Sequence, residues 1–174
     1  IIPIILSYFI VHCSISNPQN MIYFFRIGDG TMNYKIGKDY RDNDALRHSF
    51  NKLATETFGL SFESWYQNGY WGEKYIPYSI VVDGIVISNV SVNLIDCILN
   101  GKIKHYIQLG TVMTKKSHRG NGYCRILMET ILHDYAMCDG FFLFANDSVL
   151  DFYPKFGFQS TQEYRFCPNI SHKS

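Results

Sequence analysis

The sequence predicts an α+β fold built around one mixed sheet of six to seven strands with about four helices. Two-residue turn signals, Asp83-Gly84 and Asn100-Gly101, separate runs of apolar and β-branched residues, so these runs are expected to form consecutive antiparallel strands. Further along, a glycine-containing loop at 115–122 leads into an amphipathic helix and then a short apolar strand. A helical crossover of this kind joins parallel strands, so the sheet is expected to be antiparallel first and parallel later.

The length and composition predict one globular domain. The chain has 174 residues, of which 47% are hydrophobic and 18% charged, enough apolar material to bury a substantial core. The formal net charge of +1 gives no overall attraction to nucleic acid or to a membrane, so neither partner is expected. Five scattered cysteines without CxxC spacing argue against a disulfide framework or a metal site, and favour a reducing, cytoplasmic location.

The first twenty residues differ from the rest of the chain. Residues 1–10 are almost wholly apolar, the apolar run is too short to span a membrane, and the first methionine is Met21. We interpret residues 1–20 as a non-native segment or a fragment of something upstream, and residues 21–174 as the domain. The alternative is that this segment adds a hydrophobic strand or helix to the domain.

The first half of the domain begins with a strand at Asn33 to Ile36. Asp42 or Asn43 can cap a helix whose apolar residues follow helical spacing, and Gly59 is expected to end it. Ser61 is a second candidate cap, for a short helix. Strands are then expected at 78–82, 85–94 and 102–114.

The second half continues the pattern after the loop. The helix there carries one apolar stripe, typical of packing against a core: Cys124, Leu127, Met128, Ile131 and Tyr135. A strand is predicted at 141–145, a short helix at 148–156 ended by Gly157, and a last strand at 158–166.

The loop Arg119-Gly120-Asn121-Gly122 is the strongest candidate for a binding site. Glycines allow the backbone to approach a ligand closely, and the first N–H groups of the following helix have no partner inside the helix and attract anions. Lys115 and Lys116 add positive charge. We interpret the loop as a diphosphate-binding site; an ordinary glycine-rich turn is the alternative.

Residues Arg119 to Cys124 resemble the Q/R-x-x-G-x-G/A motif of the GCN5-related N-acetyltransferase (GNAT) family, with Cys124 in place of the final small residue. A second segment, Asn146 to Phe158, is similar to the "N…fY…GF" segment of the same family. The resemblance implies a GNAT-like fold whose sheet is splayed between the fourth and fifth strands, acetyl-CoA as cosubstrate, and a homodimer as the expected assembly.

The resemblance also implies roles for individual residues. Tyr153 matches the family's general acid, and an ordinary tyrosine is protonated at neutral pH and able to donate; a core tyrosine is the alternative. Asn146 is expected to bind the pantetheine arm or to cap a turn. The implied cofactor-binding set is Val112 and Thr114 through their backbone, with Arg119, Gly120, Asn121, Gly122, Tyr123, Cys124 and Asn146.

The general base is the least defined part of the site. Gln108 stands where several family members carry a glutamate, and an amide cannot accept a proton at neutral pH. Three ways for the amine to lose its proton remain open: a water chain relays the proton, the amine arrives already neutral, or another group of the protein accepts the proton. The other groups are Glu63, His105 and Asp96.

An aromatic cluster precedes the central strands and has two interpretations. Its members could form a cation–π site for an amine, or they could pack in the core and loops. The cluster comprises Trp65, Tyr66, Tyr70, Trp71, Tyr75 and Tyr78.

The resemblance implies an acetyl-CoA-dependent N-acetyltransferase that transfers acetyl directly to a primary amine of a small molecule or peptide. A non-catalytic acyl-CoA-binding or sensor module is the first alternative, kept open by Gln108. A nucleic-acid or protein interaction domain is the second, which the near-neutral charge disfavours.

Overall fold

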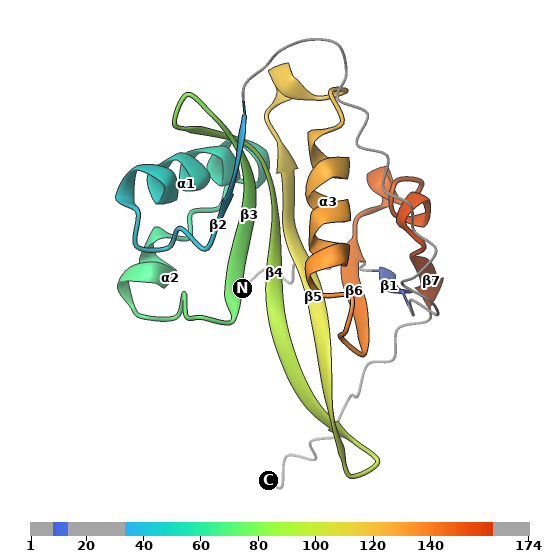
Figure 1. The fold of residues 1–174 in the computed structure, drawn as a ribbon. Helices are drawn as coiled ribbons and strands as arrows, with labels where there is room; N and C mark the ends of the chain where they lie inside the picture. Colours follow the sequence, from blue (N-terminus) through green and yellow to red (C-terminus); the bar gives the residue numbers. More distant parts are fainter. Residues whose placement is uncertain (1–8, 14–33, 162–174) are drawn as a thin grey trace, which may run out of the picture.

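The computed structural model describes residues 9–13 and 34–161 of the chain, and in this part a seven-stranded sheet has the order β2-β3-β4-β5-β6-β1-β7 (Figure 1). The strands are β1 (Phe9–Cys13), β2 (Lys35–Lys38), β3 (Tyr75–Val82), β4 (Ile85–Leu99), β5 (Lys102–Thr114), β6 (Gly140–Ala145) and β7 (Gln159–Thr161). The α-helices are α1 (Asp44–Phe58), α2 (Glu63–Gln67) and α3 (Tyr123–Asp134). The described residues also contain the 3₁₀ helices η2 (Lys116–His118), η3 (Asp147–Val149) and η4 (Tyr153–Phe156).

The strand directions confirm the predicted mixed sheet. Strands β2 to β5 are antiparallel neighbours, whereas β5 and β6 are parallel and joined through α3. Both predicted hairpin turns are present, with positive φ at both central residues of each: 49° and 78° at Asp83-Gly84, 52° and 74° at Asn100-Gly101. This conformation matches the twist of the flanking strands, so the turn residues determine where the two long hairpins reverse.

The helices cover opposite faces of the sheet. On one face, α3 buries Leu127, Met128 and Ile131 against alternate residues of β3 to β6. On the other face, α1 buries Phe50 and Leu53 in a second cluster with Trp71, Tyr75 and Met113. Burial of this much apolar surface on both faces is the main favourable contribution to folding, and it holds the strand ends that form the site described below.

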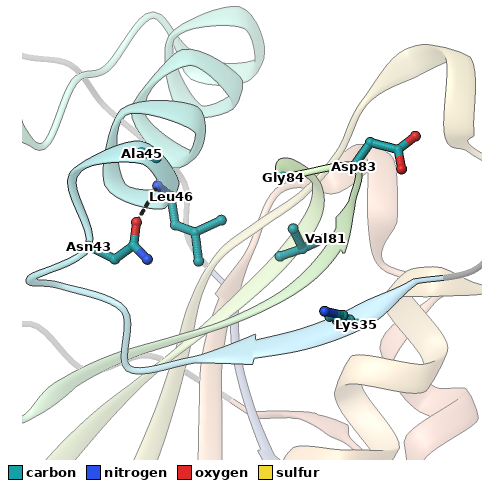
Figure 2. A pocket seen from close by; sticks show the side chains of 7 residues that line it. All are labelled: Lys35, Asn43, Ala45, Leu46, Val81, Asp83 and Gly84. Carbon is teal, nitrogen blue, oxygen red and sulfur yellow. Dashed lines mark hydrogen bonds between the residues drawn. The ribbon is translucent and has the colours of Figure 1, made fainter.

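The ends of α1 are as predicted. The Asn43 side chain accepts a hydrogen bond from the Leu46 backbone N–H at 3.1 Å (Figure 2), and Gly59 ends the helix in the left-handed region with φ 69°. The cap predicted for α2 is wrong in position. Phe62 occupies the cap position without a side-chain hydrogen bond, and Ser61 only accepts a bond from the Glu63 backbone at 3.4 Å.

The segment after β6 departs from the prediction of one helix over 148–156. It forms two short 3₁₀ helices, η3 and η4, separated by a turn. Pro154 lies in the first turn of η4. Proline has no N–H to donate and its ring collides with the preceding turn, so it kinks or breaks an α-helix when it lies in the interior. Gly157 ends the segment as predicted, with φ 85°.

The seventh strand comes from the apolar N-terminal segment. Strand β1 pairs antiparallel with β6, Phe9 opposite Ala145, and on its other side with β7. The backbone of Phe9–Cys13 therefore forms the extra strand that was the alternative interpretation of residues 1–20. The predicted first strand is observed two residues later, as β2. Strand β7 covers the start of the predicted strand at 158–166, whose remainder lies outside the described residues.

Over the described ranges, none of the helices combines the length and apolar character needed to cross a membrane.

Candidate functional site

The site begins where strands β5 and β6 separate. Their pairing runs from Tyr106 with Gly140 to Leu109 with Leu143, and β5 then continues from Gly110 to Thr114 without pairing to β6. Strands β5 and β6 are the fourth and fifth strands of the prediction, which did not count β1, so this separation is the predicted splay. A cleft of about 990 Å³ opens there. Nine of the predicted site residues line it: Val112, Thr114, Arg119, Gly120, Gly122, Tyr123, Cys124, Asn146 and Tyr153.

A bulge in β5 forms one wall of the cleft. Two residues, Thr111 and Val112, lie opposite Val90 alone, because the register with β4 shifts between Asn89 and Ser91. Thr111 has φ 49°, a left-handed conformation that costs a β-branched residue free energy and persists only where the surroundings enforce it. The bulge turns this stretch of β5 away from regular pairing, and so presents its backbone to the cleft.

A buried hydrogen-bond network holds the bulge. The amide of Asn89, which is fully buried, donates to the Thr111 carbonyl at 2.9 Å and to the Ser91 hydroxyl at 2.9 Å. Its carbonyl oxygen accepts from the Ser79 hydroxyl at 2.8 Å. The Tyr75 and Thr111 hydroxyls are also bonded, at 3.0 Å. Each polar group of the network is satisfied, which rigidifies the site as well as stabilising it.

The loop before α3 has the conformation that its glycines allow. Gly120 and Gly122 have φ 83° and 77°, and Gly122 occupies the cap position of α3. Arg119 Nε donates to the Thr114 carbonyl at 3.1 Å, which ties the loop to the end of β5. Asn121 donates to the His118 carbonyl at 3.2 Å and lies outside the cleft lining. Arg119 and Asn121 therefore brace the loop.

The first turn of α3 faces the cleft with its backbone donors. The N–H groups of Cys124 and Arg125 have no carbonyl partner within the helix, because its first hydrogen bond is donated by Ile126 to Gly122 at 3.1 Å. Arg119 and Arg125 both line the cleft. This end of the cleft combines helix N–H groups with positive charge, the environment that binds phosphate groups. Lys115 and Lys116 are not among the lining residues.

Tyr153, at the start of η4, lines the same cleft as the first turn of α3. Its ring is buried and packs against Phe152 and Phe158, with centroids 5.3 and 6.2 Å away. Burial raises the pKa of the Tyr153 hydroxyl to about 12, with a smaller contribution from the Cys124 thiol. The hydroxyl therefore keeps its proton throughout the neutral range. Asn146 takes the cap position of η3 without a capping hydrogen bond from its side chain, and lines the cleft.

None of the alternative bases lines the cleft. The Gln108 side chain donates to the Leu109 backbone carbonyl at 3.2 Å, and Gln108 is paired with Asn93 across the β4–β5 hairpin. Glu63 is held by Arg47 at 3.2 Å. Asp96 and His105 are bonded to each other at 2.8 Å, in the exposed part of the β4–β5 hairpin.

The aromatic cluster divides between packing positions. Trp65, Trp71 and Tyr75 pack around Phe62, with centroid separations between 5.1 and 6.4 Å. Most of these contacts are edge-to-face, whereas Phe62 and Tyr75 are stacked and the two tryptophans are tilted to each other. Tyr78 instead belongs to the opposite face, where its hydroxyl donates to Asp134 at 2.8 Å. Tyr66 covers the Arg47 guanidinium at 3.8 Å, a cation–π contact within the protein. None of the six residues of the predicted cluster lines the cleft, although Phe62 beside them does, so the structure agrees with the packing interpretation.

A second, smaller pocket of about 480 Å³ lies between the start of α1 and the β3–β4 turn (Figure 2). Lys35 and Asp83 are at its strand side, and Asn43 and Leu46 at its helix side. None of the predicted site residues lines it. The cleft at the β5–β6 separation is therefore the candidate functional site.

Sequence reasoning missed several lining residues. Phe58, the last residue of α1, and Leu60, in the connection between α1 and α2, reach the cleft although they are remote from both motifs in the sequence. Phe144, the last residue but one of strand β6, also lines the cleft. Arg125 could have been found, because it lies in the first helical turn after the glycines. The positions of Phe58 and Leu60 had no signal in the sequence, since only tertiary packing brings them there.

The fold is similar to that of several solved acetyltransferases. An acetyltransferase from Trypanosoma brucei has 15% sequence identity and a TM-score of 0.63, over 79% of this chain and 100% of that chain. A predicted acetyltransferase with acetyl-CoA from Clostridium acetobutylicum has 16% identity and a TM-score of 0.63, over 78% and 96%. Glucosamine-6-phosphate N-acetyltransferase from Arabidopsis thaliana has 16% identity and a TM-score of 0.60, over 80% and 99%. At these identities the likeness concerns the fold alone.

A comparison of the sequence with curated proteins gave no significant match. The family model of the GNAT acetyltransferases, by contrast, matches residues 43–158. This range extends from the cap of α1 to the residue after Gly157, and it contains the bulge, the glycine loop and Tyr153. The separated strands, the loop and the family match lead to the same conclusion: this chain belongs to the acetyltransferase (GNAT) family.

Proposed function

We propose that the protein is an acetyl-CoA-dependent N-acetyltransferase that transfers acetyl directly to a primary amine of a small molecule or peptide. One observation supports the proposal: residues of the α3 N-terminus, the β5 bulge and Tyr153 line a single cleft. A diphosphate would bind at Gly120, Gly122 and the α3 N-terminus, and the pantetheine arm would lie along Val112 to Thr114. The thioester would then lie beside Tyr153.

In the proposed reaction the amine nitrogen attacks the thioester carbonyl carbon. The carbon–nitrogen bond forms, the carbon–sulfur bond breaks, and the departing sulfur gains negative charge. Tyr153 donates a hydrogen bond and then its proton to that sulfur. The nitrogen, positively charged after the attack, loses one proton to water, and a proton from water restores the Tyr153 hydroxyl, so the products are the acetylated amine and the free thiol of coenzyme A. Because the alternative bases do not line the cleft, we propose that the amine enters uncharged.

The chemistry of Cys124 favours direct transfer over an acyl-enzyme intermediate. Burial raises the pKa of this thiol to about 12, and only the thiolate is an effective nucleophile. At neutral pH roughly one thiol in 10⁵ is ionised. We therefore propose that Cys124 does not act as a nucleophile, and that the acetyl group passes directly from the thioester to the amine.

The proposal is tested by thermal melting with and without acetyl-CoA. At about 100 times its dissociation constant the cosubstrate adds roughly 2.7 kcal/mol, which raises the melting temperature of a domain of this size by about 5–10 °C. An amine panel monitored for free thiol follows. A folded protein whose melting does not change at millimolar acetyl-CoA would contradict the proposal.

The second candidate is a non-catalytic acyl-CoA-binding module. The position of Gln108 and the lack of a carboxylate among the described lining residues favour it. The same experiments separate the two functions, because this module would show the melting shift without release of thiol.

A further inference from the structure

Part of the lining of the cleft is an apolar wall of three large side chains. They are Phe58, the last residue of α1, Leu60, in the connection between α1 and α2, and Phe144, in β6. Large apolar side chains are normally exposed singly, but these come from distant parts of the chain and line one cleft. Their exposed fractions are 43% for Phe58, 56% for Leu60, 42% for Phe144 and 37% for the neighbouring Val149.

The charges of the cleft are positive. Among the described lining residues, the permanently charged side chains are Arg119 and Arg125, both at the α3 end. The nearest acid on α2, Glu63, is neutralised by its own contacts: it accepts from Arg47 at 3.2 Å, Asn51 at 3.0 Å and Gln67 at 2.8 Å. Arg125 is also paired with Glu129 at 3.3 Å, and both arginines lie at the end of the cleft proposed for the diphosphate. Among the described lining residues, no carboxylate is left as a counter-ion for a cationic acceptor.

We propose, building on the function above, that the acceptor is a primary amine carried on an apolar body without a second positive charge. The body lies against Phe58, Leu60 and Phe144, while the amine points toward the thioester beside Tyr153. Each methylene placed in an apolar pocket is worth roughly tenfold or more in kcat/KM. A second ammonium group at the same place would have to lose its water without a partner, which is unfavourable.

A matched pair of amines tests this inference. Hexylamine and 1,6-diaminohexane have the same chain, and only the diamine carries a second charge. With acetyl-CoA as donor and free thiol as readout, kcat/KM for hexylamine should exceed that for the diamine by at least roughly tenfold. Equal values, or a preference for the diamine, would overturn the inference while the transferase function stands.

Two variants test whether the preference for hexylamine depends on the apolar wall. Leu60→Glu adds a carboxylate where the chain end of the amine should lie, so the hexylamine preference should fall by roughly tenfold or reverse. Leu99→Glu is the control, because Leu99 is 52% exposed and lies at the far tip of the β4–β5 hairpin. Its preference should equal that of the natural protein, and an unchanged preference in Leu60→Glu would overturn the inference.

Two further outcomes would also overturn the inference. A large gain in rate with hexanoyl-CoA, without discrimination between the two amines, would mean that the apolar wall receives the acyl chain. A melting shift with acetyl-CoA but no thiol release with either amine would favour the binding module instead. Absence of the melting shift would contradict the proposed function itself, so the two failures are distinguishable.

Discussion

Tyr153 is the residue on which the proposed chemistry depends. Tyr153→Phe should lower kcat roughly 100-fold, because the departing sulfur loses its proton donor, and should leave the acetyl-CoA dissociation constant nearly unchanged. Since the pKa of the hydroxyl is raised to about 12, the natural enzyme should keep this donor protonated up to about pH 10. Stopped thiol-release assays across pH 6–10 would measure both effects.

The control for this substitution is Tyr70→Phe. Tyr70 is an exposed tyrosine in the turn before β3 and lies outside the cleft, so its loss should not change kcat. Equal kcat for Tyr153→Phe and the natural protein across the whole pH range would remove Tyr153 from the acid role.

Gly122 provides a second test at the scale of one residue. Gly122→Val should abolish the melting shift with acetyl-CoA, because a branched side chain at the cap of α3 would occupy the space of the diphosphate. The substitution also strains the backbone at φ 77°, by about 1–2 kcal/mol. Isothermal titration with acetyl-CoA would measure the loss of binding.

Gly69→Val separates strain from crowding. Gly69 has φ 76°, nothing lies within 4 Å of the position a Cβ would take, and it is remote from the cleft. It should lose similar stability but still bind acetyl-CoA. If both variants bind equally well, the glycine loop is an ordinary turn.

At the scale of elements, the bulge of β5 depends on a neighbouring strand. Asn89→Ala removes the donor to the Thr111 carbonyl and leaves the Ser79 and Ser91 hydroxyls without this buried partner. We expect a loss of about 2 kcal/mol of unfolding free energy, and weaker acetyl-CoA binding because the bulge is no longer held. Urea unfolding and cofactor titration would measure the two effects.

Asn93→Ala is the matched substitution on the same strand. Asn93 makes one long bond of 3.5 Å to the Gln108 carbonyl, so its removal should cost less than about 1 kcal/mol. A loss of stability without any change in cofactor affinity for Asn89→Ala would show that the network stabilises the fold and does not position the site.

At the scale of the whole molecule, Asp134 links α3 to strands β2 and β3 at one edge of the sheet. It lies at the end of α3, accepts from Tyr78 on β3 at 2.8 Å, and pairs with Lys38 on β2 at 3.1 Å. Burial raises the pKa of Asp134, but the bonds from Tyr78 and Lys38 outweigh it and hold the pKa below its ordinary value. A carboxyl with a lowered pKa stabilises the fold above its unfolded pKa of about 4, and this stabilisation is lost as pH falls.

The melting temperature should therefore fall between about pH 5 and pH 2, and Asp134→Asn should remove part of that slope. The amide still accepts from Tyr78 but carries no charge for Lys38. The exposed Asp42→Asn is the control and should keep the slope. Identical slopes for Asp134→Asn and the natural protein would contradict this account.

Much of the architecture was predictable because it depends on local chemistry. Asp83-Gly84 and Asn100-Gly101 form tight hairpin turns because these residue types tolerate positive φ angles. Asn43 caps the start of α1 with its side chain, and Gly59 ends the helix because glycine readily adopts the left-handed conformation. Helical spacing after the glycine loop predicted α3, and the crossover then required a parallel β6. The prediction of a single helix at 148–156 was wrong because it placed Pro154, which disrupts helical hydrogen bonding, in the interior of that helix.

By itself, the sequence determined the order of the elements, the mixed sheet and the positions of the glycine loop and Tyr153, since each follows from residues close together in the chain. Only the tertiary structure decided three further features: the positive φ of Thr111, the extra strand β1 between β6 and β7, and the apolar wall of Phe58, Leu60 and Phe144. Each depends on contacts between segments far apart in the sequence. Neither periodicity nor a motif records such contacts, because they arise only when the strands pair and the helices pack against them.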